Sequence, residues 1–141
     1  MKTAVIVYHS KTGTTKKYAE EMSKYLKSKG LDTRVTSIQA YSEEMLNNID
    51  YVLFGCWTSG LMVALQHPEQ KWVDFAAKLP SMPDAKVALF TTYKILTGSM
   101  FWNMAKYLKS KFTVPSQKLK SRDGSLSEKD MQALDRFISR V

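Results

Sequence analysis

The chain has 141 residues, of which 44% are hydrophobic and 24% are charged, and it carries a formal net charge of +8. This composition predicts one soluble domain spanning residues 1–141 and excludes a transmembrane segment, because no apolar run is long enough. The apolar run after Lys2 indicates a strand rather than a signal peptide, and the single Cys56 excludes an internal disulfide, which favours a cytoplasmic protein.

Five β-rich runs are spaced along the chain. The first and third are almost continuously apolar, as expected for parallel strands that are covered on both faces, whereas the second has a wetter face that indicates an edge strand. The predicted strands are Thr3–Tyr8, Arg34–Ile38, Tyr51–Cys56, Lys86–Thr92 and Thr113–Leu119.

A helical pattern follows each strand. Gly30 provides a C-terminal stop for the first helix, and Ser127 with Asp130 resembles a capping box for the last. The first predicted helix runs from about Thr15 to Lys29, and the second is a short helix that Ser42 caps, with Glu43 and Glu44 in its first turn. The third begins at Pro68 and Glu69 and continues through Leu79, the fourth runs from a Ser99 cap to Phe112, and the fifth runs from Ser127 to Ile138.

Strand and helix therefore alternate five times, which predicts an α/β fold with right-handed crossovers. The expected architecture is a doubly wound, five-stranded parallel sheet with helices on both faces, in three layers. In such sheets the ligand lies beyond the carboxyl ends of the strands, near the point where the strand order reverses. The loops after the first, third and fourth strands are therefore the candidate site.

The loop after the first strand is suited to an anion. Backbone N–H groups at a helix N-terminus point outward and carry the positive end of the helix dipole, and Gly13 allows a close approach. Hydroxyl groups and lysines add donors and positive charge. These side chains belong to Ser10, Thr12, Thr14, Thr15, Lys11, Lys16 and Lys17.

The same loop resembles a known phosphate-binding segment. Its pattern Ser10-x-Thr12-Gly13-x-Thr15 is similar to the S/T-x-T-G-x-T loop with which flavodoxins wrap the phosphate of FMN. It is neither a P-loop nor a dinucleotide-binding loop, because the glycine spacing of both is absent. The resemblance covers essentially the whole chain in strand order and length, and implies a flavodoxin-like fold with FMN as cofactor.

Two further loops support this resemblance. Gly55-Cys56-Trp57-Thr58-Ser59-Gly60 resembles a flavin-contacting G-C-x-T-x-G segment, although the aromatic residue stands two places early and Leu61 and Met62 follow where acidic residues are common. Thr91-Thr92-Tyr93 falls where flavodoxins carry a hydroxyl pair and a flavin-stacking tyrosine. The cofactor-binding residues that the resemblance implies are Ser10, Lys11, Thr12, Gly13, Thr14, Thr15, Cys56, Trp57, Thr58, Ser59, Gly60, Thr92, Tyr93, Thr97 and Gly98.

Three functions follow as hypotheses. The first is an electron-transfer protein, a monomer that carries single electrons between redox partner proteins and has no catalytic residue of its own. The second is an FMN-dependent reductase or oxidase acting on quinones or porphyrinogens, for which a chain of 141 residues leaves little room over the flavin. The third is a flavodoxin fold without FMN that serves as a basic binding module. Neither a metal site nor specific nucleic-acid binding is predicted.

The excess positive charge lies in the C-terminal half. Residues 1–70 contain 8 basic and 7 acidic side chains, whereas residues 71–141 contain 13 and 6. Such an excess of positive charge attracts and orients partners with acidic surfaces. A solvated face that serves only solubility is an equally good interpretation of the same charges. Between residues 94 and 122 there are seven basic side chains and no acidic one: Lys94, Lys106, Lys109, Lys111, Lys118, Lys120 and Arg122.

Overall fold

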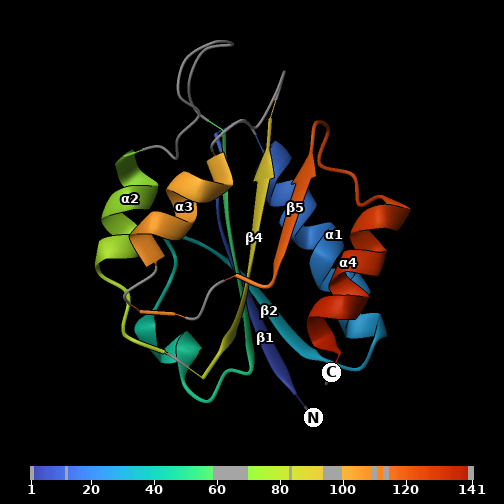
Figure 1. Cartoon of the computed structure of the whole chain (residues 1–141), viewed down its shortest axis with the longest axis horizontal. Coiled ribbons are helices and arrows are strands. Elements are labelled where there is room, and N and C mark those ends of the chain that lie inside the picture. The colour runs from blue at the N-terminus through green and yellow to red at the C-terminus, as the bar shows by residue number, and fades with distance from the viewer. Residues whose placement is uncertain are drawn as a thin grey trace.

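Five parallel strands form one sheet in the order β2-β1-β3-β4-β5, with helices on both of its sides (Figure 1). The computed structural model describes residues 2–11, 13–58, 70–82, 84–93, 100–108, 111–112 and 115–139. The predicted doubly wound α/β fold is thereby confirmed. The strands are β1 (Thr3–His9), β2 (Asp32–Ser37), β3 (Tyr51–Trp57), β4 (Lys86–Thr92) and β5 (Gln117–Ser121); the helices are α1 (Thr14–Ser28), the 3₁₀ turn η1 (Glu43–Leu46), α2 (Gln70–Ala77), α3 (Met100–Leu108) and α4 (Glu128–Ile138).

The strand order reverses between β1 and β3. β1 pairs with β2 on one side and with β3 on the other, and β2 forms the edge, as its wetter pattern predicts. The connections that follow β1 and β3 lead in opposite directions, so a crevice opens between the carboxyl ends of these two strands. Doubly wound sheets bind their ligands in this crevice.

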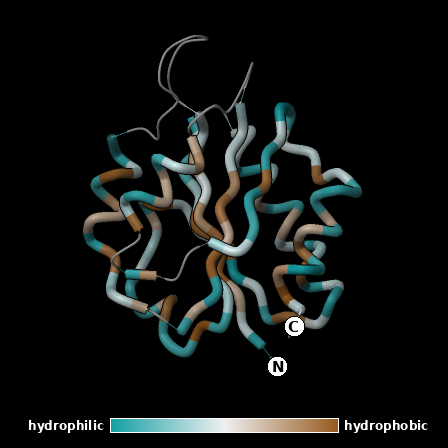
Figure 2. The backbone as a smooth tube through the Cα atoms, in the orientation of Figure 1, coloured by the Kyte–Doolittle hydropathy of each residue, from teal (hydrophilic) through white to brown (hydrophobic). Residues whose placement is uncertain are grey.

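The sheet separates two hydrophobic clusters. On one side α1 and α4 pack on the sheet through Tyr18, Leu26 and Leu134. On the other side α2 and α3 pack through Trp72 and Met104. Figure 2 shows the hydrophobic stretches concentrated along the central strands and on the helix faces turned towards them.

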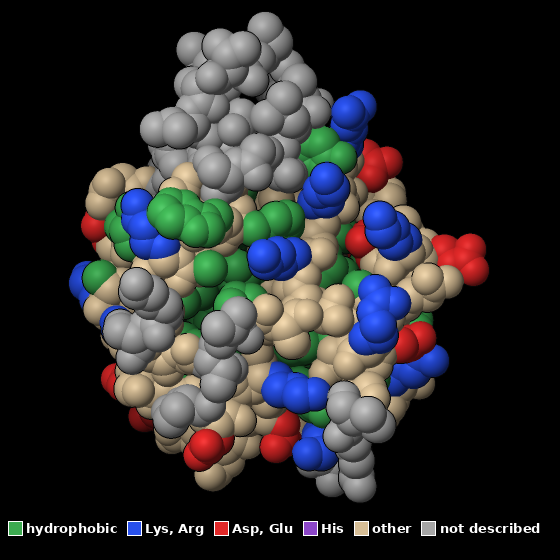
Figure 3. Space-filling view, in the orientation of Figure 1, with side chains coloured by type: hydrophobic (Ala, Val, Ile, Leu, Met, Phe, Trp, Pro, Cys, Tyr) green, Lys and Arg blue, Asp and Glu red, His purple; other side chains and the backbone are tan. Residues whose placement is uncertain are grey.

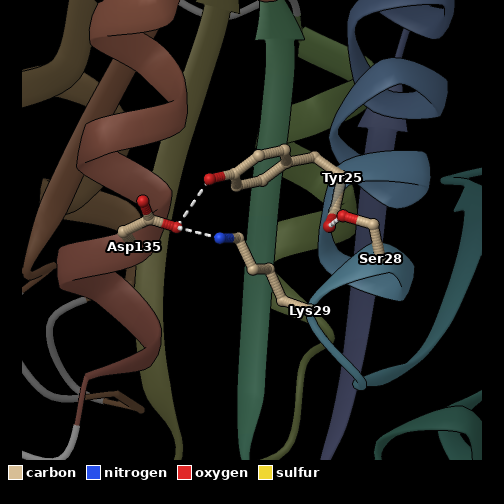
Figure 4. A network of polar contacts seen from close by, with 4 residues as sticks. All are labelled: Tyr25, Ser28, Lys29 and Asp135. Carbon is tan, nitrogen blue, oxygen red and sulfur yellow. Dashed lines mark hydrogen bonds and ion pairs between the residues drawn. The ribbon is translucent and has the colours of Figure 1, made fainter.

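Polar contacts join α1 to α4. The Tyr18 hydroxyl donates a hydrogen bond of 2.8 Å to a carboxylate oxygen of Asp130, and the Tyr25 hydroxyl donates one of 2.7 Å to Asp135. Lys29 adds an ion pair of 3.7 Å to the same oxygen of Asp135 (Figure 4). These contacts fix the two helices of this layer against each other.

Several predicted boundaries are confirmed. The backbone N–H groups of Gly30 and Leu31 bond back to Lys27 and Leu26 as the first helix ends, and the capping box of Ser127 with Asp130 is present. Pro68, Glu69 and Ser99 lie outside the described residues. Among the described residues, no helix has the length and apolar character that crossing a bilayer requires.

The second strand runs from Asp32 to Ser37 rather than from Arg34 to Ile38, and α2 ends at Ala77 rather than Leu79. Three further local predictions were wrong. The last strand begins at Gln117 rather than Thr113, because Pro115 has no N–H to give to a strand ladder. The fourth helix ends at Leu108, so Phe112 is buried in the turn beyond it. Ser42 stands at the start of a single 3₁₀ turn and its side chain makes no capping bond.

Candidate functional site

Threonine hydroxyls hold together the three loops at the carboxyl edge of the sheet. The side-chain oxygens of Thr15, on α1, and Thr92, at the end of β4, lie 2.6 Å apart. Thr91 donates to the Cys56 carbonyl at 2.6 Å and lies 2.8 Å from the Thr58 hydroxyl, while the Thr58 N–H donates to the Thr92 carbonyl at 2.8 Å. The first turn of α1 and the ends of β3 and β4 are therefore cross-linked by short hydrogen bonds.

The N-terminus of α1 is built as an open turn. Gly13 precedes the helix with a φ of 95°, a left-handed conformation that glycine adopts without strain, and its N–H donates to the Ser10 hydroxyl at 2.9 Å. A Cβ built on Gly13 meets no described atom within 4 Å. Within the described part of the chain, no side chain caps this helix, and its first turn carries no acidic residue.

The loop after β5 packs against the first turn of α1. Gly124 has a φ of 82°, and a Cβ placed on it would lie 2.6 Å from the Thr14 carbonyl oxygen. The Gly124 N–H donates to the Ser121 hydroxyl, and the Lys17 ammonium donates to the Asp123 carbonyl. The Asp-Gly pair signals a turn in the sequence, but nothing in the sequence reveals its contact with α1.

Hydrogen bonds within that loop affect the acidity of Asp123. The pKa of its carboxyl lies below the ordinary value because the Ser125 N–H donates to it at 2.9 Å and the Ser125 side chain also hydrogen-bonds to it. The Ser121 hydroxyl and the Lys17 charge make smaller contributions. The ionised carboxylate therefore holds the loop in the shape that contacts α1.

Two aromatic rings stand at the ends of β3 and β4, and each has a cation beside it. The Lys11 ammonium lies 4.8 Å from the centroid of the Trp57 ring. The Lys120 ammonium and the Arg122 guanidinium carbon lie 5.8 Å and 5.5 Å from the centroid of the Tyr93 ring. These distances fall within the range of cation–π attraction. The edge is therefore both aromatic and positively charged.

The described candidate residues meet at this one edge, and they differ in exposure. Lys11 and Gly13 are exposed, whereas Thr15, Cys56 and Thr92 are buried, the Cys56 side chain in the core shared with α2 and α3. Thr12, Ser59, Gly60, Thr97 and Gly98 lie outside the described residues. The candidates that meet at the edge are Ser10, Lys11, Gly13, Thr14, Thr15, Cys56, Trp57, Thr58, Thr92 and Tyr93.

Comparison with known proteins identifies the family to which this sequence and this fold correspond. The family model described as flavodoxin matches residues 6–131. This chain belongs to the flavodoxin family. No curated protein matches this sequence.

Solved flavodoxin structures share the architecture of this chain. Two-electron reduced flavodoxin from Megasphaera elsdenii superposes with a TM-score of 0.75 at 21% identity, over 95% of this chain and 96% of that one. Flavodoxin 1 from Bacillus cereus gives 0.73 at 16% identity, over 99% of each chain. A flavodoxin from the Archaea gives 0.67 at 22% identity, over 96% and 92%. At these identities the structures establish the fold that they share.

The donor set at the start of α1 suits a flavin phosphate. An uncapped helix N-terminus without acidic residues attracts anions, and the open space at Gly13 admits a group against the backbone. Lys16 and Lys17, both exposed in the first turn of α1, raise the local positive potential. The residues present therefore fit the group that the family implies.

Proposed function

We propose that this protein binds FMN at the carboxyl edge of its sheet and carries single electrons between redox proteins. The observation that carries the proposal is the turn into α1: a left-handed Gly13 followed by a helix of 15 residues that has no side-chain cap among the described residues. Membership of the flavodoxin family supports the same conclusion. When bound, FMN supplies the electron-accepting ring system, and the protein supplies anchoring, orientation and electrostatics.

The residues from Ser10 to Thr15 would hold the phosphate. Backbone N–H groups and the hydroxyls of Ser10, Thr12 and Thr14 would donate to its oxygens, while Lys11 would add positive charge. The Thr15 hydroxyl instead bonds to Thr92, so its contribution is to keep the turn beside the end of β4.

The residues at the ends of β3 and β4 would hold the ring. Trp57 and Tyr93 would stack against its two faces, because aromatic pairs favour offset contact. Cys56 and Thr92 would contribute through the backbone, since their side chains are buried. The remaining ring contacts are proposed for Thr58, Ser59, Gly60, Thr97 and Gly98.

The site is expected to favour reduced flavin more than an acidic site would. Lys11 lies beside the Trp57 ring, and Lys120 and Arg122 lie beside the Tyr93 ring. Positive charge stabilises an anionic reduced flavin, so the more negative of its two one-electron potentials should be raised. We further propose a cytoplasmic monomer whose redox partners present acidic surfaces.

An FMN titration followed by stepwise reduction tests this function. Flavin fluorescence should be quenched on binding, and the bound flavin should take up electrons in two separate one-electron steps. Failure to quench would contradict the proposal and favour the basic binding module. Steady turnover of NAD(P)H with a quinone by the isolated protein would contradict the electron carrier and favour the reductase.

A further inference from the structure

Strand β5 presents opposite chemistry on its two faces. Leu119 is buried among the side chains of the α1 and α4 layer. Successive residues of a strand point to opposite faces, so Lys118 and Lys120 lie on the face that α3 covers over β4. In the β4–β5 register Lys118 is the partner of Leu89, which is buried in the α2 and α3 cluster. The helical cover on this side therefore stops at β4, and the adjoining face of β5 carries exposed lysines.

Helix α3, which borders this uncovered strand, exposes aromatic side chains. Met104 packs inward, but Trp102 is 68% exposed and Tyr107 is 37% exposed. The Lys106 ammonium lies 5.6 Å from the centroid of the Trp102 ring and 5.2 Å from that of Tyr107. We name the surface formed by Trp102, Lys106, Tyr107, Lys118 and Lys120 the β5–α3 face.

The charge on the β5–α3 face is not neutralised by the described part of the protein. Among the described residues the ion pairs join Lys24 to Glu21 and Lys29 to Asp135, and none involves Lys106, Lys118 or Lys120. Figure 3 shows Lys and Arg side chains gathered over β5, with hydrophobic side chains exposed over α3.

One neighbouring lysine has a structural role instead. Lys111 donates hydrogen bonds to the carbonyls of Ala76 and Ala77 at the C-terminus of α2, where a cation also favours the helix dipole. Lys106, Lys118 and Lys120 differ from Lys111 in that their charged groups stay at the surface, where a partner can reach them.

Protection of an edge strand explains only part of this surface. Exposed lysines on an edge strand discourage pairing with other chains, which would account for Lys118 and Lys120. It does not account for Trp102, which lies on a helix and leaves most of its ring in water. Tryptophan and tyrosine are instead enriched at the centres of protein interfaces, inside a polar rim.

The β5–α3 face also reaches the proposed flavin site. The side chain of Lys120 lies beside the Tyr93 ring, and the Tyr93 N–H donates to the Ser121 carbonyl at 3.2 Å. A protein bound on this face would therefore lie next to the edge where electrons would enter and leave.

We infer that the β5–α3 face docks an acidic redox protein, with Trp102 as the apolar anchor and Lys106, Lys118 and Lys120 as the charges that attract and orient it. This inference rests on the proposed function for the electron transfer that docking serves. Complementary charge raises the association rate and fixes orientation. Nucleic acid is disfavoured because strong binding commonly involves about six to ten phosphate contacts, more than these cations provide.

Isothermal titration calorimetry with an acidic plant-type ferredoxin tests the docking. The full chain is supplied with excess FMN and titrated at low and at physiological ionic strength. Binding should weaken as salt is added. The charge reversal K118E/K120E should weaken it by about tenfold or more, and W102A by about threefold to tenfold.

A control variant distinguishes an effect of the β5–α3 face from an effect of the net charge of the protein. K24E/K71E changes the net charge equally at exposed positions on α1 and α2, away from β5, and should weaken ferredoxin binding less than threefold. An equal loss in both double variants, no loss in W102A, or no measurable ferredoxin binding would each overturn the inference. Tighter binding of a short DNA duplex than of ferredoxin would overturn it in favour of a polyanion surface.

Flavin binding is scored separately on the same samples. Calorimetry with ferredoxin reports docking whether or not FMN is taken up, and fluorescence quenching reports FMN uptake whether or not ferredoxin binds. Should K118E/K120E fail to fold by circular dichroism, W102A decides the docking question, because its exposed ring contributes little to folding.

Discussion

The two helical layers cover the sheet to different extents. On the α1 and α4 side, the cover extends across the whole sheet from β2 to β5: Val35 of β2 packs against the cluster, Leu119 of β5 is buried, and Tyr18 joins α1 to Asp130 of α4. On the α2 and α3 side the cover stops at β4, and the next strand exposes Lys118 and Lys120. One strand thus stabilises the fold with one face and exposes the other face, which is the face that we propose for docking.

This difference separates residues needed for folding from residues free to bind. Substitutions towards α1 and α4 should lower stability, because they disturb a closed core. Substitutions on the β5–α3 face should leave stability nearly unchanged and alter binding or potential.

Among the substitutions that add a side chain, the largest loss of stability is expected at Gly55, in the middle of the sheet on the α1 and α4 side. A Cβ on Gly55 would lie 2.0 Å from the ring of Phe90, which is fully buried and packs edge-on against Tyr18. Because this ring has no free space, G55A should lower the free energy of unfolding by about 3 kcal/mol in urea denaturation. A loss below about 0.5 kcal/mol would show that the layer is not closed.

Gly124 is the next most sensitive position. An alanine there would need a φ of 82° and would press on the Thr14 carbonyl. G124A should therefore cost about 2 kcal/mol in the same denaturation and weaken FMN binding, because Thr14 begins α1. G30A serves as the control: Gly30 also has a positive φ of 90°, but a Cβ there meets no described atom within 4 Å, so the variant should lower stability without weakening FMN binding. Unchanged FMN affinity in G124A would contradict support of the phosphate turn by this loop.

The cations beside Tyr93 should set the flavin potential. Removing one unit charge at ~7 Å, with an effective dielectric constant of ~20, changes the energy by roughly 2 kcal/mol before screening. K120A/R122A should therefore make the lower one-electron potential more negative by tens of millivolts in a redox titration. An unchanged or less negative potential would contradict the proposed electrostatic role.

Tyr18 should contribute less than the glycines. Its pKa is raised by burial and by the nearby Asp130 carboxylate, so it stays protonated in the folded protein. Y18F removes one hydrogen bond and should cost about 1.5 kcal/mol near neutral pH.

The same residue predicts a pH dependence. A phenol whose folded-state pKa is raised stabilises the fold fully below its ordinary pKa of 10.0 and loses that contribution as the pH rises above it. Stability should therefore fall above pH 10 less steeply in Y18F than in the unsubstituted protein. Equal slopes in urea denaturation across this range would contradict the assignment.

The smallest effect on stability is expected on the β5–α3 face. W102A should change the free energy of unfolding by less than about 0.5 kcal/mol, because Trp102 is 68% exposed. W72A is the control on the same side of the sheet: Trp72 is fully buried, and its truncation should cost about 3–5 kcal/mol. A large loss in W102A would mean that this ring stabilises the fold instead of remaining available for docking.

The sequence predicts the architecture well because periodicity reports burial. The apolar runs of β1 and β3, the amphipathic pattern of α1 and the capping box at Ser127 all depend on neighbours close in sequence. The start of β5 was misplaced because its strand is short and edge-positioned, so its pattern is weak.

Contacts between segments that are distant in the sequence could not be predicted from the sequence. The bond between Thr15 and Thr92 joins residues 77 positions apart, and the approach of Gly124 to Thr14 depends on how the loop after β5 packs. The basic run from residue 94 to 122 was visible, but only the strand register separates Lys118 and Lys120 from Lys111, which caps α2.

A crystal structure of the protein grown with excess FMN tests the central claim most directly. We expect the phosphate against the backbone from Ser10 to Thr15, with the flavin ring between Trp57 and Tyr93. A phosphate bound elsewhere, or a turn into α1 that excludes FMN while its N–H groups bond within the chain, would contradict it.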